Sequence, residues 1–315
     1  MYDDYQRLLT KVATLYYVDD IPQNVIAMQL HLSKSKVCRL LAEAKKQGIV
    51  HTSIYSTHEQ SSNERLFERH YGLREAIIVS GSGNPLDGVG SAGAEYLRRV
   101  IREGDIIGVS WGRTLYSIVS KINTIRVDNV QIVQLVGGLD TMMNQVQSGK
   151  LAMQFAIASG CDAQLLYCPA RAGSMELKQS LMIDPVVNQV FQSGRKANIA
   201  LVGIGAVSPT SDLFQSGHLQ VDMLRELREA GAVGDICMRF YDESGREVKA
   251  RNEDLTMSIA YEDLRRIPNV VAVATGMEKG DAILGALKSG ILNTLIIDKT
   301  TAEYVLSLDG LTPEH

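Results

Sequence analysis

Leu32-Ser33-Lys34-Ser35-Lys36-Val37-Cys38-Arg39-Leu40-Leu41 is the stretch that decides the fold of the N-terminal part of the chain. It follows the short helical pattern Asn24-Val25-Ile26-Ala27-Met28-Gln29-Leu30, with a turn at residues 31–33 between them. Ser33 is a good N-cap for a helix that begins directly after it. Two short helices joined by a tight turn form a helix-turn-helix, whose second helix enters the major groove of DNA. The stretch therefore predicts a DNA-binding unit.

Apolar positions on either side of the turn predict a small core for this unit. Residues 8–16 carry apolar side chains three and four positions apart, which is typical of an amphipathic helix. Residues 19–22 interrupt that helix, and Pro22 suits the first turn of the next one. Residues 49–54 have the apolar content of a short strand, which would form a wing. We expect a winged helix-turn-helix domain over residues 1–56.

The local charge of this unit favours a nucleic-acid partner, although the whole chain of 315 residues carries a net charge of −4. Within residues 33–51 the basic side chains outnumber the single acidic side chain of Glu43. The basic residues there are Lys34, Lys36, Arg39, Lys45 and Lys46. DNA phosphates interact with this local excess rather than with the total charge. A solvated helix face is the alternative interpretation of the same pattern.

Outward positions on the second helix of the motif are the candidate DNA contacts. They are Ser33, Lys34, Ser35, Lys36 and Arg39. Tyr17 and Gln23, at the ends of the two preceding helices, are placed for phosphate or groove contacts, although Tyr17 could instead cap the small core. Lys45, Lys46 and His51 are better suited to contact the DNA backbone.

From residue 57 onward the pattern is that of an α/β domain, because strand-like apolar runs alternate with helical patterns. The predicted strands are 76–79, 106–109, 130–136, 164–167, 199–202, 270–274 and 295–297. The predicted helices are 91–102, 114–122, 151–158, 185–192, 223–230, 282–289 and 301–306. Nearly continuous apolar strands indicate a doubly wound, mostly parallel sheet with helices on both faces. We expect residues 57–315 to form a domain that binds an effector and mediates oligomerisation.

Several classes of protein are disfavoured by the composition. No apolar run approaches the ~20 residues that a bilayer span requires, and the acidic N-terminus is unlike a signal peptide. No pair of cysteines has C-x-x-C spacing, so the four cysteines are expected to be free thiols in a cytoplasmic protein. We therefore expect no metal, no cofactor and no membrane association.

Ligands of such domains bind where the strands end and the helices begin. The loop Ser110-Trp111-Gly112-Arg113-Thr114 combines a glycine, a hydroxyl and the free amides of a helix N-terminus, which suits an anion. Lys279 lies at the start of another helix, where its charge opposes the helix dipole and a bound anion would compensate it. Arg113 could add a charge or lie at a subunit surface.

Three further loops are weaker candidates. Residues 136–140 follow a predicted strand that contains Gln134, and residues 203–208 are rich in small side chains. Asp235 follows a glycine-bounded turn and precedes the apolar run Ile236–Phe240, which we expect to be a strand. A carboxylate there can accept hydrogen bonds from sugar hydroxyls, although a turn or capping role is the alternative.

The chain resembles the SorC family of bacterial sugar-operon regulators, and the matches occur in the family's order over nearly the whole chain. In the N-terminal part they are Leu15-Tyr16-Tyr17, Ile26-Ala27, Leu30, Leu32-Ser33, Val37 and Arg39-Leu40-Leu41. In the remainder they are Gly108-Val109-Ser110-Trp111-Gly112-Arg113-Thr114, Gly203-Ile204-Gly205, Gly231-Ala232-Val233-Gly234-Asp235, Lys279, Asp298 and Thr301-Ala302. The family's effector domain is similar to sugar-phosphate isomerases but works as a sensor.

The resemblance implies a role for each candidate residue. The effector's phosphate would contact Gly112, Arg113 and Thr114 with Lys279, its sugar would contact Asp235, and Gln134 would be a further pocket position. The DNA contacts would be Tyr17, Gln23 and the second helix of the motif. The chain departs from the family at Pro22, where relatives have a Ser or Thr cap, and at Thr275-Gly276, where many have two glycines.

These observations favour a non-enzymatic, ligand-controlled transcription factor that binds double-stranded operator DNA as a homo-oligomer. A single helix-turn-helix makes few contacts, and the resemblance implies dimers that pair into tetramers. The competing hypothesis is a sugar-phosphate isomerase or aldolase fused to a DNA-binding module, with Asp140, Asp235 or Lys279 as the base. Lys279 could also form a Schiff base with an aldehyde effector.

Overall fold

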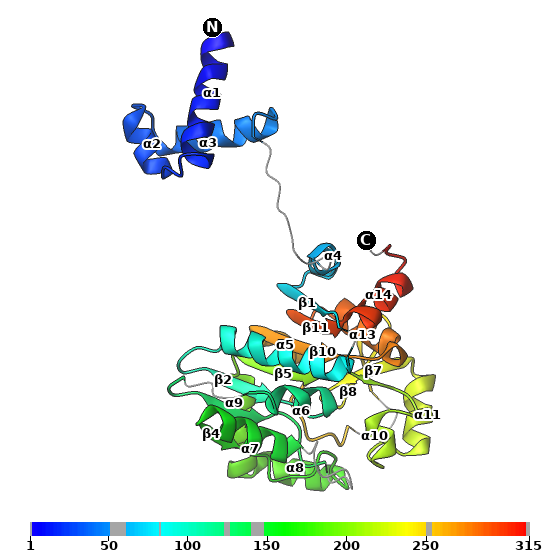
Figure 1. Cartoon of the computed structure of the whole chain (residues 1–315). Helices are drawn as coiled ribbons and strands as arrows, with labels where there is room; N and C mark the ends of the chain where they lie inside the picture. Colours follow the sequence, from blue (N-terminus) through cyan, green and yellow to red (C-terminus); the bar gives the residue numbers. More distant parts are fainter. Residues whose placement is uncertain are drawn as a thin grey trace. The chain divides into compact units, whose positions relative to one another are not determined.

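The computed structural model of the chain describes residues 2–50, 61–81, 83–122, 127–139, 148–249 and 254–312. Contacts between residues divide the chain into two compact units, Met1–His58 and Glu59–His315 (Figure 1). Each unit has its own hydrophobic core. No helix in the described ranges is both long and apolar enough to cross a membrane.

Over residues 2–50 the N-terminal unit contains three helices, α1 (Tyr2–Tyr17), α2 (Gln23–Gln29) and α3 (Lys34–Lys46). Their buried core contains Leu9, Val12, Ala13, Ile26, Ala27, Val37, Leu40, Leu41 and Ala44. The Ser33 side chain accepts a hydrogen bond from the backbone N–H of Lys36, which caps α3 as the sequence predicts. Helices α2 and α3 are joined by a short turn, at the place where the sequence predicts a helix-turn-helix.

Two local predictions for this unit are wrong. Pro22 stands at the N-cap of α2, one residue before the helix, rather than inside its first turn. Ile49 and Val50 form a bend and not a strand, and both backbone N–H groups donate to the carbonyl oxygen of Ala44 in the turn that follows α3. The rest of the predicted wing, residues 51–54, lies outside the described residues.

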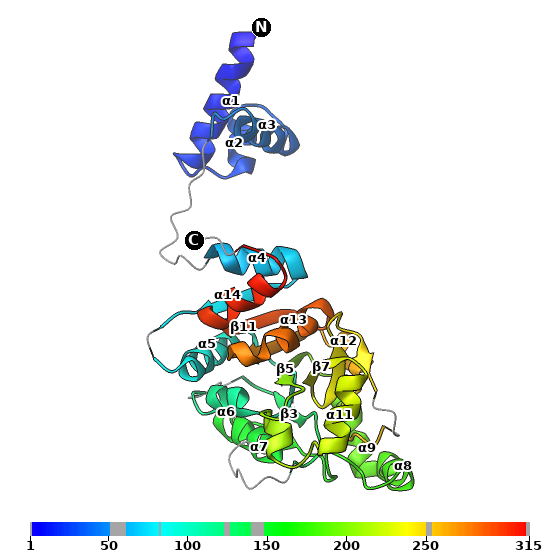
Figure 2. The same ribbon diagram turned by 90° about the vertical axis from the view of Figure 1, so that its right-hand side faces the viewer.

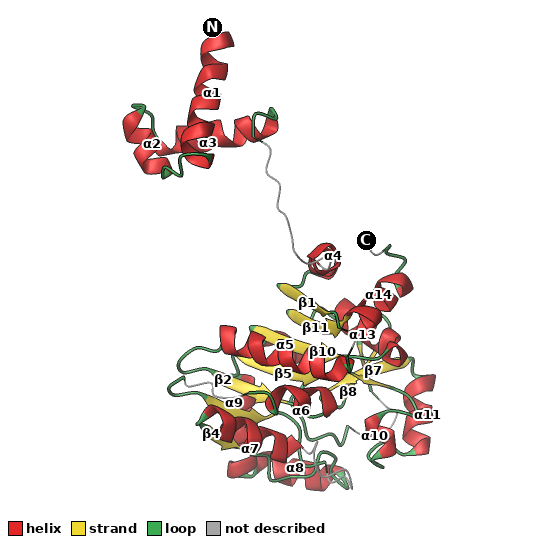
Figure 3. Cartoon of the chain, in the orientation of Figure 1, coloured by secondary structure: helices red, strands yellow, loops and turns green. Residues whose placement is uncertain are grey.

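The larger unit is built on a seven-stranded sheet in which every pairing is parallel (Figure 3). Its strand order is β1-β11-β10-β5-β2-β3-β4. The strands are β1 (Glu75–Val79), β2 (Ile106–Val109), β3 (Gln131–Gln134), β4 (Asp162–Gln164), β5 (Ile199–Gly203), β10 (Asn269–Ala274) and β11 (Thr294–Asp298). Each overlaps one of the seven predicted strands.

Helices cover both faces of the sheet, as a doubly wound fold requires (Figure 2). On one face lie α5 (Pro85–Val100), α6 (Arg113–Val119) and α7 (Ser148–Ser159). The other helices are α4 (Ser61–Tyr71), α8 (Met175–Ile183), α9 (Pro185–Arg195), α10 (Asp212–Gln215), α11 (Val221–Glu229), α12 (Tyr261–Arg266), α13 (Gly280–Lys288) and α14 (Lys299–Leu308). Of these, α4, α9 and α14 pack on the opposite face, and α8, α10 and α12 were not predicted.

The larger unit also contains a four-stranded antiparallel sheet, in which the predicted strand Ile236–Phe240 is wrong. It contains β6 (Gly205–Ala206), β7 (Ala232–Ile236), β8 (Arg239–Asp242) and β9 (Glu247–Val248). The run Ile236–Phe240 is not one strand, because the chain reverses at Cys237 and Met238. These residues have φ angles of 55° and 59°, which are typical of a two-residue hairpin turn. The hairpin places Asp235 on β7 beside β6.

Candidate functional site

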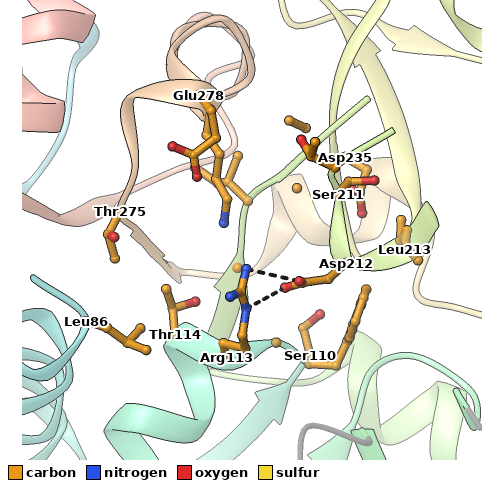
Figure 4. Close-up of a pocket in the computed structure, with 18 of the residues that line it drawn as sticks. Leu86, Ser110, Arg113, Thr114, Ser211, Asp212, Leu213, Asp235, Thr275 and Glu278 are labelled. Carbon is orange, nitrogen blue, oxygen red and sulfur yellow. Dashed lines mark hydrogen bonds and ion pairs between the residues drawn. The ribbon is translucent and has the colours of Figure 1, made fainter. Parts of the chain in front are cut away.

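A cavity of about 370 Å³ opens where β2, β5 and β10 end and the following loops begin (Figure 4). Ligands of doubly wound folds occupy this edge of the sheet. The cavity is lined by Asn84, Leu86, Ser110, Trp111, Gly112, Arg113, Thr114, Gly203, Ile204, Gly205, Ala206, Thr210, Ser211, Asp212, Leu213, Asp235, Cys237, Thr275, Glu278 and Lys279. The structure thus brings together five of the six predicted effector residues.

The loop after β2 supplies the first of these residues. Gly112 is the N-cap of α6 and has a φ of 126°. Residues other than glycine rarely adopt this backbone conformation. Thr114 is buried in the first turn of α6, whereas Arg113 beside it is exposed. Because α6 has only seven residues, its dipole is weak, and the positive charge of the pocket comes mainly from side chains.

Asp235 is the buried acid of the pocket. It is 4% exposed, and its Oδ2 accepts a hydrogen bond of 3.0 Å from the backbone N–H of Met238 in the hairpin turn. Burial raises the pKa of Asp235 to about 6, while that hydrogen bond and the charge of Lys279 act in the opposite direction. Gly205 makes room for the carboxylate, because a Cβ at this position would overlap its Oδ1.

Lys279 is the half-buried cation of the pocket. It ends the short 3₁₀ turn Met277–Lys279 and immediately precedes α13. Burial lowers the pKa of its ammonium group, and the charge of Arg113 acts in the same direction. The carboxylates of Asp212, Glu278 and Asp235 oppose this shift, with the largest of these contributions from Asp212. A cation in such a setting gains most from a bound anion.

Asp212 is a charged lining residue that the sequence did not indicate. It begins the four-residue helix α10 and forms a bidentate ion pair with Arg113. Nε of Arg113 lies 3.1 Å from Oδ2, and one terminal nitrogen lies 3.0 Å from Oδ1. Figure 4 shows the guanidinium and the carboxylate facing one another inside the ring of lining residues. Sequence proximity offered no clue, since the partners are 99 positions apart.

Gln134 does not line this cavity, which corrects its assignment as a pocket residue. Its side chain is 3% exposed and fully engaged in internal hydrogen bonds. Nε2 donates to the carbonyl oxygen of Val136 at 2.6 Å and to Oγ of Ser148 at 2.9 Å, and Oε1 accepts from the N–H of Leu166 at 3.0 Å. Gln134 therefore links the end of β3 to its neighbours. Asp140, a candidate base in the loop that follows Gln134, lies outside the described residues.

The candidate DNA contacts are all at least partly exposed on the surface of the N-terminal unit. Ser33, Lys34, Ser35, Lys36 and Arg39 are all exposed at the start of α3. Tyr17 is also exposed, at 39%, and the ammonium of Lys45 lies 5.4 Å from its ring centroid. Tyr17 is therefore held beside the end of α3 rather than inside the core. Gln23 is partly exposed as the first residue of α2.

No group of three His, Cys, Asp or Glu side chains within the described ranges could hold a metal ion. The four cysteines are free thiols: Cys38 is exposed, Cys161 is half-buried, and Cys168 and Cys237 are buried.

Comparison with known proteins places the chain in a family. Residues 56–307 match the Sugar-bind model, which describes a sugar-binding domain. The "Deoxyribonucleoside regulator" of Bacillus subtilis is 33% identical over 307 residues, covering 96% of this chain and 98% of the relative. The "Sorbitol operon regulator" of Klebsiella pneumoniae is 30% identical over 316 residues, covering 95% and 98%.

Two solved structures agree with this placement, and one of them covers nearly the whole chain. The full-length sorbitol operon regulator SorC from Klebsiella pneumoniae has a TM-score of 0.75 at 30% identity, covering 96% of this chain and 99% of that chain. A DeoR family transcriptional regulator from Listeria monocytogenes has a TM-score of 0.74 at 27% identity, covering 79% and 100%. The chain therefore belongs to the SorC family of sugar-responsive bacterial transcriptional regulators.

Proposed function

We propose that this protein controls a carbohydrate-utilisation operon and that a phosphorylated sugar, bound in the 370 Å³ cavity, controls its operator binding. The observation that supports this function best is the placement of a half-buried lysine, Lys279, and a buried acid, Asp235, on the wall of one cavity. The cation suits the phosphate and the acid suits sugar hydroxyls. The volume is within the ordinary range for small-molecule sites.

The phosphate would lie at the loop after β2, within reach of Lys279. Lys279 and Arg113 supply charge, the hydroxyl of Thr114 supplies a donor, and Gly112 lets the backbone approach the ligand. Asp235 would then face hydroxyl groups, because a carboxylate beside a phosphate would repel it. Selectivity for the sugar would thus come from Asp235, and selectivity for a phosphorylated ligand from Lys279.

The N-terminal unit would bind DNA through α3, with Tyr17 and Gln23 as flanking contacts. One helix-turn-helix makes too few contacts for tight specific binding, so we expect the larger units to join two or more copies on a palindromic operator. Dimers that pair into tetramers would satisfy this requirement. Analytical ultracentrifugation with and without operator DNA measures the assembly, and a monomer at micromolar concentration in both conditions would contradict it.

The function is tested by a thermal-shift screen of the full chain against pentose and hexose phosphates and the corresponding free sugars. A ligand that binds the folded state raises the melting temperature by mass action. We expect one or a few sugar phosphates to stabilise the protein and the matching free sugars to have much smaller effects. The stabilising compounds should then change the affinity for a DNA fragment from the gene's own promoter.

An enzyme is the competing function, because the pocket holds an acid with a raised pKa beside a lysine with a lowered pKa. We propose binding without turnover, in keeping with relatives that are named as regulators. Incubation with each stabilising sugar phosphate, followed by NMR, would reveal isomerised or cleaved products. Borohydride trapping would reveal a Schiff base at Lys279.

A further inference from the structure

The carboxylate of Asp212 is an anionic group in the lining of the pocket. The carboxylate of Asp212 meets the guanidinium of Arg113 in a bidentate arrangement, with both nitrogen–oxygen distances near 3 Å. Arginine binds phosphate oxygens in the same forked geometry. The Asp212 carboxylate is also the largest favourable charge acting on Lys279. The Asp212 carboxylate thus already occupies the forked face of Arg113 that an effector phosphate would use, and its charge also acts on Lys279.

The net charge of the lining residues affects how strongly the pocket attracts a phosphate. Two cations, Arg113 and Lys279, share the pocket with three acids, Asp212, Asp235 and Glu278. With all five ionised, the wall carries one net negative charge, so an incoming phosphate dianion meets no surplus of positive charge. Removing the Asp212 carboxylate would leave two cations against two acids, free the guanidinium of Arg113 for the phosphate and take away one repulsive neighbour.

Asp212 stands on a segment that is small and held by short-range bonds. Helix α10 has four residues, and Ser211 caps it by accepting the backbone N–H of Phe214. Leu213, at 3% exposure, anchors the segment in the core of the larger unit. The ion pair with Arg113 is the long-range side-chain interaction of Asp212 among the described residues. A shift of this side chain therefore needs no rearrangement of the main sheet.

We propose that Asp212 is a built-in competitor of the effector phosphate, which pairs with Arg113 when no effector is bound and is displaced when the phosphate binds. The inference rests on the phosphate site proposed above and assigns Asp212 as the residue that sets the affinity threshold for the effector. Displacement would also free α10 from the loop after β2, so that occupancy of the pocket changes the contacts of that helix.

The test measures the affinity of the full chain for inorganic phosphate by calorimetry at constant ionic strength. Asp212→Asn keeps the shape of the side chain and removes its charge. Asp222→Asn is the matched control, because Asp222 lies on α11, is 81% exposed and pairs with Arg225 outside the pocket. Asp212→Glu retains the carboxylate, so a change in phosphate affinity that comes only from altered packing would also appear in this variant. Melting temperatures establish that each variant is folded.

We expect Asp212→Asn to bind phosphate about two- to fivefold more tightly than wild type, the size of a partly exposed ion pair. Asp222→Asn and Asp212→Glu should stay close to wild type. If wild type binds phosphate and Lys279→Ala does not, but Asp212→Asn is unchanged or weaker, the competitor role is wrong and the phosphate site stands. If neither wild type nor Asp212→Asn binds phosphate, both the site and the competitor role are wrong.

Discussion

Thr301 and Gly276 are joined by a hydrogen bond that fixes the turn carrying the pocket cation. The hydroxyl of Thr301 accepts the backbone N–H of Gly276 at 2.9 Å and donates to Oδ2 of Asp298 at 2.6 Å. Asp298 in turn caps α14 by accepting the N–H of Thr301. The start of α14 thereby holds Gly276, which has a φ of 103° and precedes the 3₁₀ turn that ends in Lys279.

Replacing Thr301 by valine should loosen this turn. Thr301→Val keeps the side-chain shape but leaves the N–H of Gly276 without its partner, so we expect a loss of about 1–3 kcal/mol in unfolding free energy. Binding of the effector should weaken as well, because Lys279 is no longer held in position. Urea denaturation and calorimetric titration measure the two effects.

The control for this variant is Thr294→Val. Thr294 is fully buried at the opposite end of β11, where its hydroxyl lies 2.9 Å from that of Tyr96. The control should lose stability by a comparable amount and retain effector affinity. Equal loss of effector affinity in both variants would show that the turn has no special role.

Asp235→Asn should make the ligand-free protein more stable at neutral pH. Burial raises the pKa of Asp235 from 3.8 to about 6, so the folded state disfavours the ionised form. The free-energy cost of ionising Asp235 in the folded state is absent below about pH 4, grows as the pH rises towards 6 and is constant above that. We expect the variant to exceed wild type by about 1–3 kcal/mol at pH 7.5.

The measurement is urea denaturation of both proteins at pH 4.5 and pH 7.5. The advantage of the variant should shrink at the lower pH, and no advantage at pH 7.5 would contradict the assignment of Asp235 as a buried ionised acid. The same variant should bind a different selection of sugars, since an amide donates as well as accepts hydrogen bonds.

Lys36→Ala and Arg39→Ala should weaken operator binding and leave effector binding unchanged. Both side chains are exposed on α3, and each should cost roughly 1–3 kcal/mol if it contacts a base edge. A phosphate contact would instead lower affinity for all sequences and reduce the salt dependence. Fluorescence anisotropy with promoter DNA measures both, and Lys11→Ala on α1 serves as the control. Unchanged affinity in both variants would place the DNA-binding surface elsewhere.

The central strands of the main sheet were predictable from sequence because they are buried on both faces. The run Val270–Ala274, for example, is continuously apolar and fully buried in β10. The edge strand β4 has no buried residue and shares only Gln164 with the predicted run 164–167. The hairpin within Ile236–Phe240 was not predictable in the same way. Its turn residues, Cys237 and Met238, are apolar and lack the Gly or Asn that usually marks a reversal.

Site residues were predictable mainly where a polar side chain lies in a loop after a strand. They were missed where their position depends on contacts between distant parts of the chain. Lys279 lies in the loop after β10, at the expected edge of the main sheet, so its place in the pocket followed from topology. Asp235 lies on β7 of the second sheet, and the signal that singled it out was the glycine-bounded turn before it. Gln134 has a similar place in the sequence, but its amide satisfies buried backbone groups. Asp212 looks like an ordinary start of a helix, and only the folded chain brings it to Arg113.

The most direct test of the central claim is calorimetric titration of wild type and Lys279→Ala with the sugar phosphate that the thermal-shift screen identifies and with its unphosphorylated sugar. Lys299→Ala, at the start of α14, controls for the loss of one lysine. Wild type and Lys299→Ala should bind the phosphorylated sugar much more tightly than the free sugar, and Lys279→Ala should lose that difference while it still binds promoter DNA. Equal binding of both ligands by wild type, or full affinity in Lys279→Ala, would contradict the account.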